Sequence, residues 1–153
     1  MTRTYPYYPA WDAGKASPLI LKAANLLQRR FPNSRNLGTY VHRDMRDKPG
    51  NLSVHATGYA LDLAYRDEGQ ARQIWDTLVG NSLTLGLAEC HWYTFGAFGA
   101  GYRCSRGEGK RGVRIYGSRA ESAGVGGPWL HIELAGDLSP DEWETRFRAI
   151  PKP

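Results

Sequence analysis

The sequence predicts an α+β fold, in which an antiparallel sheet is flanked by helices. Two kinds of apolar periodicity point to it: three segments repeat apolar residues at helical spacing after capping residues, and several others alternate like strands. Eighteen glycines and nine prolines in 153 residues indicate many turns and long connections rather than a helical bundle. With 41% hydrophobic residues, the chain is expected to fold around a core of its own.

We expect two parts, an N-terminal arm of residues 1–15 and a single domain of residues 16–153. The arm lacks the basic-then-apolar order of a signal peptide, so entry into the general secretion route is not expected. No stretch approaches eighteen consecutive apolar residues, so neither a transmembrane helix nor a membrane partner is predicted. The arm is expected to be held down, if at all, by its aromatic side chains: Tyr5, Tyr7, Tyr8 and Trp11.

Capping residues mark the start of three helices. Ser17 followed by proline opens the first, which should end at Phe31-Pro32. Asp67 and Glu68 open the second. Residues 139–142 form a capping box with proline at the first helical position, and they open the third.

Strands are expected where apolar and polar residues alternate. In the segment 58–65, the alternation sets Asp62 on a face of small residues. In the segment 129–134, it sets Trp129, His131 and Glu133 on one face. The strands are predicted at 37–42, 58–65, 86–95, 112–116 and 129–134. A loop is expected at 43–54, and a connection rich in glycine and arginine is expected between the strands at 86–95 and 112–116.

The charge and the cysteines limit the classes of partner. A formal net charge of +5 and a pI near 9.4 favour anionic partners, namely nucleic acid, a membrane surface or an anionic wall polymer, and a solvated basic surface is the alternative. The arginines are scattered apart from a modest cluster at 103–119, and no nucleic-acid-binding motif is present, so a nucleic acid partner is not expected. Cys90 and Cys104 form no metal motif, and the pattern leaves both a disulfide across a hairpin and two buried thiols open.

Three residues are candidate metal ligands: His55, Asp62 and His131. Zinc binds imidazole nitrogen and carboxylate oxygen in tetrahedral geometry, and a catalytic site keeps a fourth position for water. Gly58 lets the chain turn tightly between the first two of these residues. From residue types alone, ordinary structural roles for all three remain the alternative.

A resemblance supports the metal site. The segment Ser53–Asp62, SVHATGYALD, resembles the S-x-H-x-x-G-x-A-x-D signature of the D-alanyl-D-alanine carboxypeptidase family, and every defining position is filled. This family includes the vancomycin-resistance dipeptidases and the L-alanyl-D-glutamate endopeptidase endolysins of phages. The segment 128–133, PWLHIE, resembles the family's second motif, whose histidine is the third zinc ligand, and 43–46 resembles an arginine-bearing segment of phage members.

The resemblance covers about residues 17–135 and carries several expectations. It implies the hedgehog/DD-peptidase-like zinc peptidase fold, Zn²⁺ held by His55, Asp62 and His131, and cleavage of peptidoglycan stem peptides. The cut would be of the D-Ala-D-Ala carboxypeptidase or the L-Ala-D-Glu endopeptidase type. A phage lysis protein or virion component is then expected, held in the host cytoplasm until lysis or carried by the virion, and acting on the bacterial cell wall.

The sequence departs from the family at the general base. The family places an Asp or Glu three residues before the last ligand, and related endopeptidases place a histidine two residues before it. Pro128 and Trp129 occupy these positions, and neither can move a proton. The candidates for a displaced base are Glu133, His91 and Glu121, and the alternative for Glu133 is to accept a bond from a ligand imidazole.

Other residues are candidates for substrate binding. Arg43, and after it Arg46, could clamp a substrate carboxylate with a bidentate fork, and a solvated loop is the alternative. Ser53 is expected either to bond substrate or to tie down its loop. Because the usual base is missing, the competing hypothesis is a catalytically degenerate zinc-binding module of a phage tail, with other virion proteins as partners.

Overall fold

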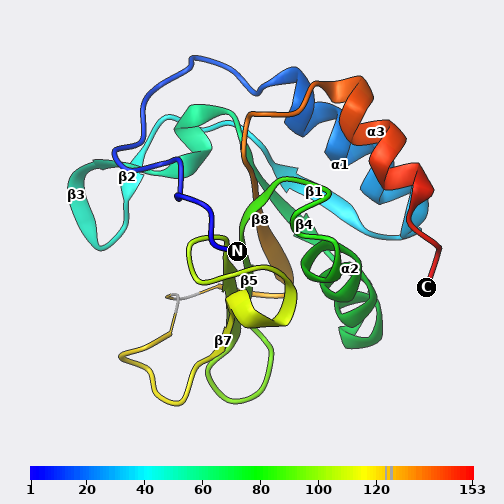
Figure 1. The fold of residues 1–153 in the computed structure, drawn as a ribbon. Helices are drawn as coiled ribbons and strands as arrows, with labels where there is room; N and C mark the ends of the chain where they lie inside the picture. Colours follow the sequence, from blue (N-terminus) through cyan, green and yellow to red (C-terminus); the bar gives the residue numbers. More distant parts are fainter. Residues whose placement is uncertain (123, 125) are drawn as a thin grey trace.

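A six-stranded antiparallel sheet forms the centre of the computed structural model, which describes residues 1–122, 124 and 126–153. Its strand order is β1-β4-β8-β5-β6-β7, and β2 pairs with β3 in a separate hairpin (Figure 1). The predicted α+β class is therefore confirmed. The strands are β1 (Arg35–Gly38), β2 (Asp44–Met45), β3 (Lys48–Leu52), β4 (Ala60–Ala64), β5 (Leu87–Trp92), β6 (Ala100–Arg103), β7 (Val113–Ile115) and β8 (Trp129–Leu134).

Three helices in the described chain cover one face of the sheet, and each begins at the predicted residue. They are α1 (Pro18–Arg30), α2 (Glu68–Gly80) and α3 (Pro140–Ala149). Ser17 caps α1 and Asp67 caps α2, with side-chain oxygens 3.1 and 2.8 Å from backbone N–H groups of the first turn. Ser139 and Glu142 form the predicted capping box of α3. Among the described residues, no helix combines the length and the apolar character needed to cross a membrane.

Alternation along the central strands separates an apolar face from a polar one. Leu61 and Leu63 of β4 are fully buried beneath the helices, and Leu130 and Ile132 of β8 join them in the same core. The intervening residues point to the other face, as the sequence predicted. Figure 1 shows the helices on one side of the sheet and the β2–β3 hairpin on the other.

The register of the central strands aligns polar residues on that second face. Asp62 of β4 pairs with His131 of β8, which pairs with His91 of β5. Glu133 of β8 pairs with Glu89 of β5 in the adjacent row. Side chains directly opposite one another lie about 4.5–5.5 Å apart at Cβ, so this register collects histidines and acids in one place.

Three sequence predictions need correction. The first strand is Arg35–Gly38 rather than 37–42: pairing with β4 continues past a bulge between Asn36 and Gly38 and ends at Gly38. The predicted loop at 43–54 contains the exposed β2–β3 hairpin, which buries no face and so shows no alternation. The predicted connection contains β6, whose Gly101 leaves room for the Tyr116 hydroxyl.

Two other features fall among the alternatives that the sequence left open. In the described residues, Cys90 and Cys104 are both free and buried, so they match the alternative of two buried thiols and not that of a disulfide. The arm of residues 1–15 has no helix or strand and crosses the polar side of the sheet. Its backbone bonds to the domain at both ends, through Arg3 N to Cys104 O and Ala13 N to Ala56 O.

The turn at Gly58 yields a first prediction. Its φ is +77°, and a Cβ there would meet the backbone of Lys15 and lie 2.9 Å from Ser17 N. We expect Gly58→Ala to lower the free energy of unfolding by about 2–4 kcal/mol, because conformational strain adds to a backbone clash. Gly14 is the matched control: its φ is +76° with nothing within 4 Å, so Gly14→Ala should cost only about 1 kcal/mol. Equal losses in chemical denaturation would contradict the role of the close approach.

Candidate metal centre

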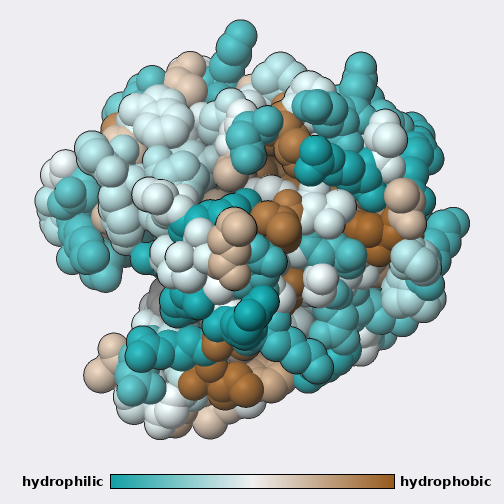
Figure 2. Space-filling model, viewed as in Figure 1, coloured by the Kyte–Doolittle hydropathy of each residue, from teal (hydrophilic) through white to brown (hydrophobic). Residues whose placement is uncertain are grey.

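A cleft of about 900 Å³ lies over the polar face of the sheet. Its floor is formed by β4, β8 and β5, and its walls by the N-terminal arm, the β2–β3 hairpin and the segment that follows β7. Figure 2 shows it as a notch between the hairpin and the segment of residues 115–122. A cleft of this size is large enough for a small molecule or a short stretch of peptide.

The three predicted ligands meet on the floor of this cleft. His55 comes from a short 3-10 helix, η1 (Val54–Thr57), and Asp62 and His131 come from paired strands. One donor atom from each lies within 4.8 Å of the others. His55 Nε2 is 3.3 Å from Asp62 Oδ2, and His131 Nδ1 is 2.9 Å from Asp62 Oδ1. The prediction that these residues form one potential metal site is confirmed, whereas the identity of the metal stays a prediction.

Local structure orients His55. The Ser53 hydroxyl accepts a bond from His55 N at 3.4 Å and caps η1, while Gly58 ends η1 in the left-handed conformation. On the imidazole itself, Nδ1 lies 3.1 Å from the carbonyl oxygen of Thr39. A backbone carbonyl can only accept, so Nδ1 donates to Thr39 and the other ring nitrogen, Nε2, is turned toward Asp62.

Glu133 orients His131 in the corresponding way. Its Oε1 lies 2.8 Å from His131 Nε2, so the opposite nitrogen, Nδ1, faces Asp62. The second carboxylate oxygen of Glu133 accepts a bond of 2.6 Å from the Tyr5 hydroxyl. Glu133 is only 2% exposed, so its charge is compensated by these partners rather than by water.

The site is strongly polarised. Burial alone would lower the pKa of His131, but hydrogen bonds from its ring to Asp62 and Glu133 outweigh that effect and raise it to about 10. Burial alone would raise the pKa of Asp62, but its bonds to His131 and His55 hold it well below the ordinary range. Without a metal, an imidazolium therefore lies between two carboxylates at neutral pH.

This donor set fits a divalent cation such as zinc. Each histidine has one nitrogen engaged by an outer acceptor and the other directed at Asp62, which is the arrangement that fixes a ligand imidazole. The Asp62 carboxylate is ionised and supplies oxygen at the same point. Two imidazole nitrogens and one carboxylate oxygen make the three-residue set that catalytic zinc sites use with a fourth, open position.

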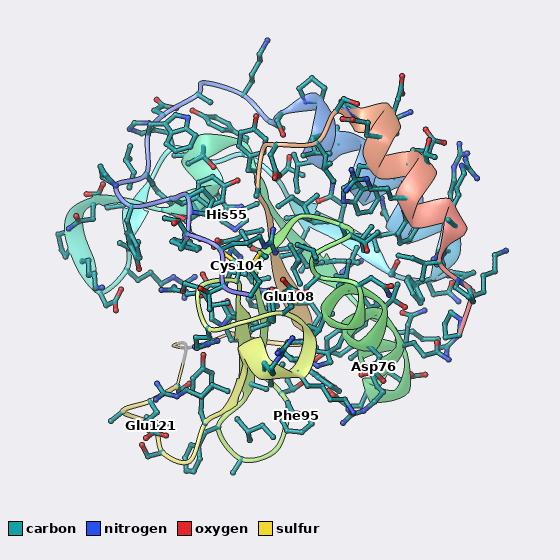
Figure 3. The ribbon with its side chains drawn as sticks, in the orientation of Figure 1. His55, Asp76, Phe95, Cys104, Glu108 and Glu121 are labelled. Carbon is teal, nitrogen blue, oxygen red and sulfur yellow. The ribbon has the colours of Figure 1, made fainter. Side chains whose placement is uncertain are left out.

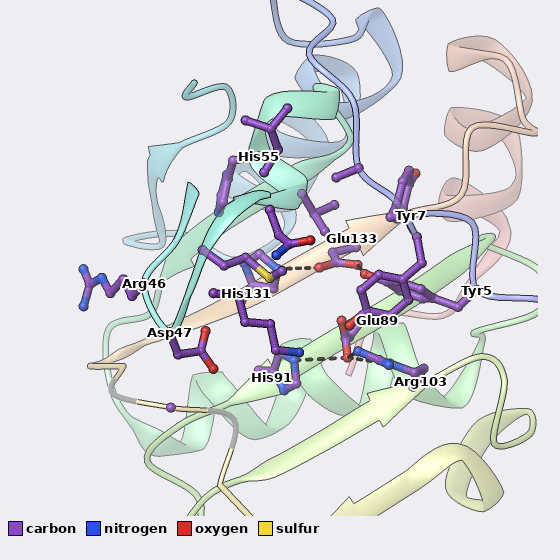
Figure 4. A pocket seen from close by; sticks show the side chains of 18 of the residues that line it. Tyr5, Tyr7, Arg46, Asp47, His55, Glu89, His91, Arg103, His131 and Glu133 are labelled. Carbon is purple, nitrogen blue, oxygen red and sulfur yellow. Dashed lines mark hydrogen bonds and ion pairs between the residues drawn. The ribbon is translucent and has the colours of Figure 1, made fainter. Parts of the chain in front are cut away.

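Of the residues proposed to bind substrate, the two arginines line the cleft and Ser53 does not. Arg43 and Arg46 line the cleft, and Figure 4 shows the Arg46 side chain directed away from its centre. Ser53 is not among the cleft-lining residues, and the bond to His55 N places it in the loop-tying role. Arg43 remains the better placed of the two arginines.

The three residues proposed for proton transfer take different positions relative to the ligands. Glu133 contacts His131 Nε2, across the imidazole from the atom that faces Asp62. His91 and Glu121 both line the cleft. The His91 ring stacks on His131 with centroids 5.9 Å apart, and Glu121 lies on the segment after β7, away from His55 in Figure 3. Trp129 packs edge-on against Tyr93, so its contact is aromatic.

Sequence reasoning missed three residues that support the site. Glu89 lies 3.2 Å from His91 Nε2, and Arg103 pairs with Glu89 at 2.7 Å. Burial alone would raise the pKa of Glu89, but His91 and Arg103 hold it below the usual range. Glu89 and His91 alternate on one strand, and this pattern could have identified Glu89 from the sequence. The third residue is Tyr5 of the arm, for which the sequence holds no such pattern.

Comparisons of the chain with family models, with curated proteins and with solved structures give no match. The site is therefore interpreted from its own geometry.

The ligand set predicts which histidines zinc requires. His55→Ala or His131→Ala should remove bound zinc, measured by elemental analysis of protein purified with zinc. Loss of the metal should also remove its stabilisation, which is about 4 kcal/mol when free metal exceeds Kd a thousandfold. His42 is the matched control, because it is exposed and pairs with Asp12, and His42→Ala should keep one zinc per chain. Wild-type zinc content in both ligand variants would contradict the assignment.

The protonation of His131 predicts a pH dependence. Because its pKa is about 10 without metal, a metal at Nδ1 must displace a proton throughout the neutral range. Zinc affinity should therefore rise about tenfold per pH unit from pH 6 to pH 8, with about one proton released per metal bound. Calorimetry in buffers of different ionisation enthalpy counts that proton. An affinity independent of pH over this range would show that Nδ1 is already unprotonated.

Proposed function

We propose that this protein is a zinc metallopeptidase that cleaves peptidoglycan stem peptides, with a fold of the hedgehog/DD-peptidase type. The observation that carries the proposal is the meeting of His55, Asp62 and His131 on the floor of an open cleft. These three residues are also the metal positions of the two motifs that resemble the D-alanyl-D-alanine carboxypeptidase family. The all-antiparallel sheet with helices on one face is compatible with that fold.

A zinc ion bound here would polarise a substrate carbonyl and lower the pKa of a bound water. The chain's own residues support this chemistry by orientation. The Thr39 carbonyl holds His55, and Glu133 holds His131, so neither ring can turn away from Asp62 without losing a bond. We assign Glu133 to this holding role, since it contacts the ring nitrogen that does not face Asp62.

The cleft walls suit an anionic peptide. Among the described residues, Arg43, Lys48 and Arg114 line the cleft without an acidic partner in ion-pair distance. Stem peptides carry free carboxylates, which an arginine fork binds through two parallel bonds. Arg43 is proposed to bind such a carboxylate from the hairpin side of the cleft.

Proton transfer must come from a residue other than those at the family's two positions. Pro128 and Trp129 hold no proton-accepting group, and Glu133 is engaged with His131 and Tyr5. Of the candidates for the general base that the sequence suggested, His91 and Glu121 are not engaged with a proposed ligand in this way. His91 is held by Glu89 through Nε2, in the manner of a carboxylate-oriented histidine.

The second candidate function is a metal-binding module without catalysis, used in a phage tail. The observation that favours it is the replacement of the usual base by Pro128 and Trp129. In this case the metal would tie η1, β4 and β8 together as a structural clip.

Turnover separates the two functions. Zinc-loaded protein should release new amino groups from purified peptidoglycan, and the sequence of the released ends identifies the bond cut. Chelation should stop the release, added zinc should restore it, and His55→Ala should be inactive because it lacks a ligand. The His42→Ala control should retain activity. Stoichiometric zinc without any cleavage of peptidoglycan, D-Ala-D-Ala peptides or L-Ala-D-Glu peptides would favour the silent module.

A further inference from the structure

We infer that Tyr5 of the N-terminal arm is a positioning residue of the metal centre, acting on His131 through Glu133. The inference rests on the metal site of the proposed function and not on peptide cleavage. In this inference the arm of residues 1–15 contributes a residue to the metal centre.

A continuous chain of hydrogen bonds connects the arm to the ligand. Tyr5 Oη donates to Glu133 Oε2 at 2.6 Å, and Glu133 Oε1 lies 2.8 Å from His131 Nε2. The carboxylate is thus held from both sides, one oxygen by the arm and the other by the ligand. Figure 4 shows this order, with Glu133 between His131 and Tyr5.

Burial makes the Tyr5 bond important for the carboxylate. Glu133 is 2% exposed, so little of its surface is open to water that could replace a lost donor. A 2.6 Å bond from a hydroxyl to a carboxylate is in the short, charge-assisted range. Without it, the Oε2 atom would be left buried and unpaired, which favours rotation of the carboxylate away from His131.

The neighbouring acid, Glu89, explains why a neutral donor is needed beside Glu133. Glu89 lies directly opposite Glu133 in the sheet and takes the nearby cation, because Arg103 donates to Glu89 Oε1 at 2.7 and 2.8 Å. The Arg103 guanidinium lies 4.4 Å from the centroid of the Tyr5 ring. In the described residues, His131 is the one ion-pair partner of Glu133. Tyr5 therefore supplies the donor that Arg103 does not.

The arm has other attachments, so the Tyr5 hydroxyl can be removed without releasing it. Arg3 bonds to the carbonyl oxygens of Ser82 and Cys104 at 3.2 and 3.1 Å. Tyr7 is buried, its hydroxyl donates to the Leu134 carbonyl, and its ring packs edge-on against Tyr5. Tyr7→Phe removes a hydroxyl from the same arm without touching Glu133, which makes it a matched control.

The test is zinc affinity, measured by competition with a chelator on the full chain. Outer partners of metal-bound histidines contribute about 10–100-fold to affinity, and we expect Tyr5→Phe to weaken zinc binding by roughly tenfold. Tyr7→Phe should stay within about twofold of wild type, since it leaves the carboxylate in place. With Co²⁺ as the probe, Tyr5→Phe should shift the visible absorption bands and Tyr7→Phe should not. The melting temperature of the metal-free variants shows whether either has lost its fold.

A double variant keeps the inference testable if Tyr5→Phe is also less stable. If Tyr5 acts through Glu133, then adding Tyr5→Phe to Glu133→Ala should change zinc affinity by less than about twofold. A full tenfold loss in that background, or equal losses from Tyr5→Phe and Tyr7→Phe, would overturn the inference. Wild-type affinity in Tyr5→Phe would overturn it while leaving the metal site intact, whereas absence of zinc from the wild-type chain would overturn the metal site itself.

Discussion

The antiparallel pairing of β4, β8 and β5 is the constraint on which the rest of the structure depends. Its register places Asp62, His131 and His91 in one row and Glu133 beside Glu89 in the next. Because side chains alternate along a strand, the same pairing directs the leucines of these strands and Ile132 toward the helices. A slip of one residue would turn both sets over, so the core and the site are specified together.

Charge compensation is the second constraint. Six buried or partly buried acids and histidines lie on the floor of the cleft: His55, Asp62, Glu89, His91, His131 and Glu133. Burying such groups is costly unless each is paired. The pairing is reciprocal: Glu133 is held by His131 and Tyr5, and Glu89 by His91 and Arg103. A divalent cation would displace the proton from His131 and add one positive charge beside the carboxylates of Asp62 and Glu133. The polar face is thus arranged for a cation before any substrate enters.

The chemistry of the cleft depends on what lies around the metal position. Lys48 of the hairpin and Arg114 of β7 line the cleft, and neither has an acidic partner within ion-pair distance among the described residues. The polar face also supplies firm orientation of both ligand histidines. The family that the two motifs resemble places its base at the positions that Pro128 and Trp129 occupy here, and neither side chain can move a proton. The proposed peptidase and the silent module therefore share one metal site and differ in proton transfer alone.

The sequence by itself determined the features that depend on local pattern. The helix starts at Ser17, Asp67 and Ser139 follow from capping, and the alternation along β8 puts His131 and Glu133 on one face. The signature around His55 and Asp62 then selected the ligands. Only the tertiary structure decided the β2–β3 hairpin, strand β6 and the partners of the buried acids. Tyr5 lies 128 positions before Glu133, and a contact across that separation leaves no periodicity in the sequence, because it depends on where the folded sheet places the arm.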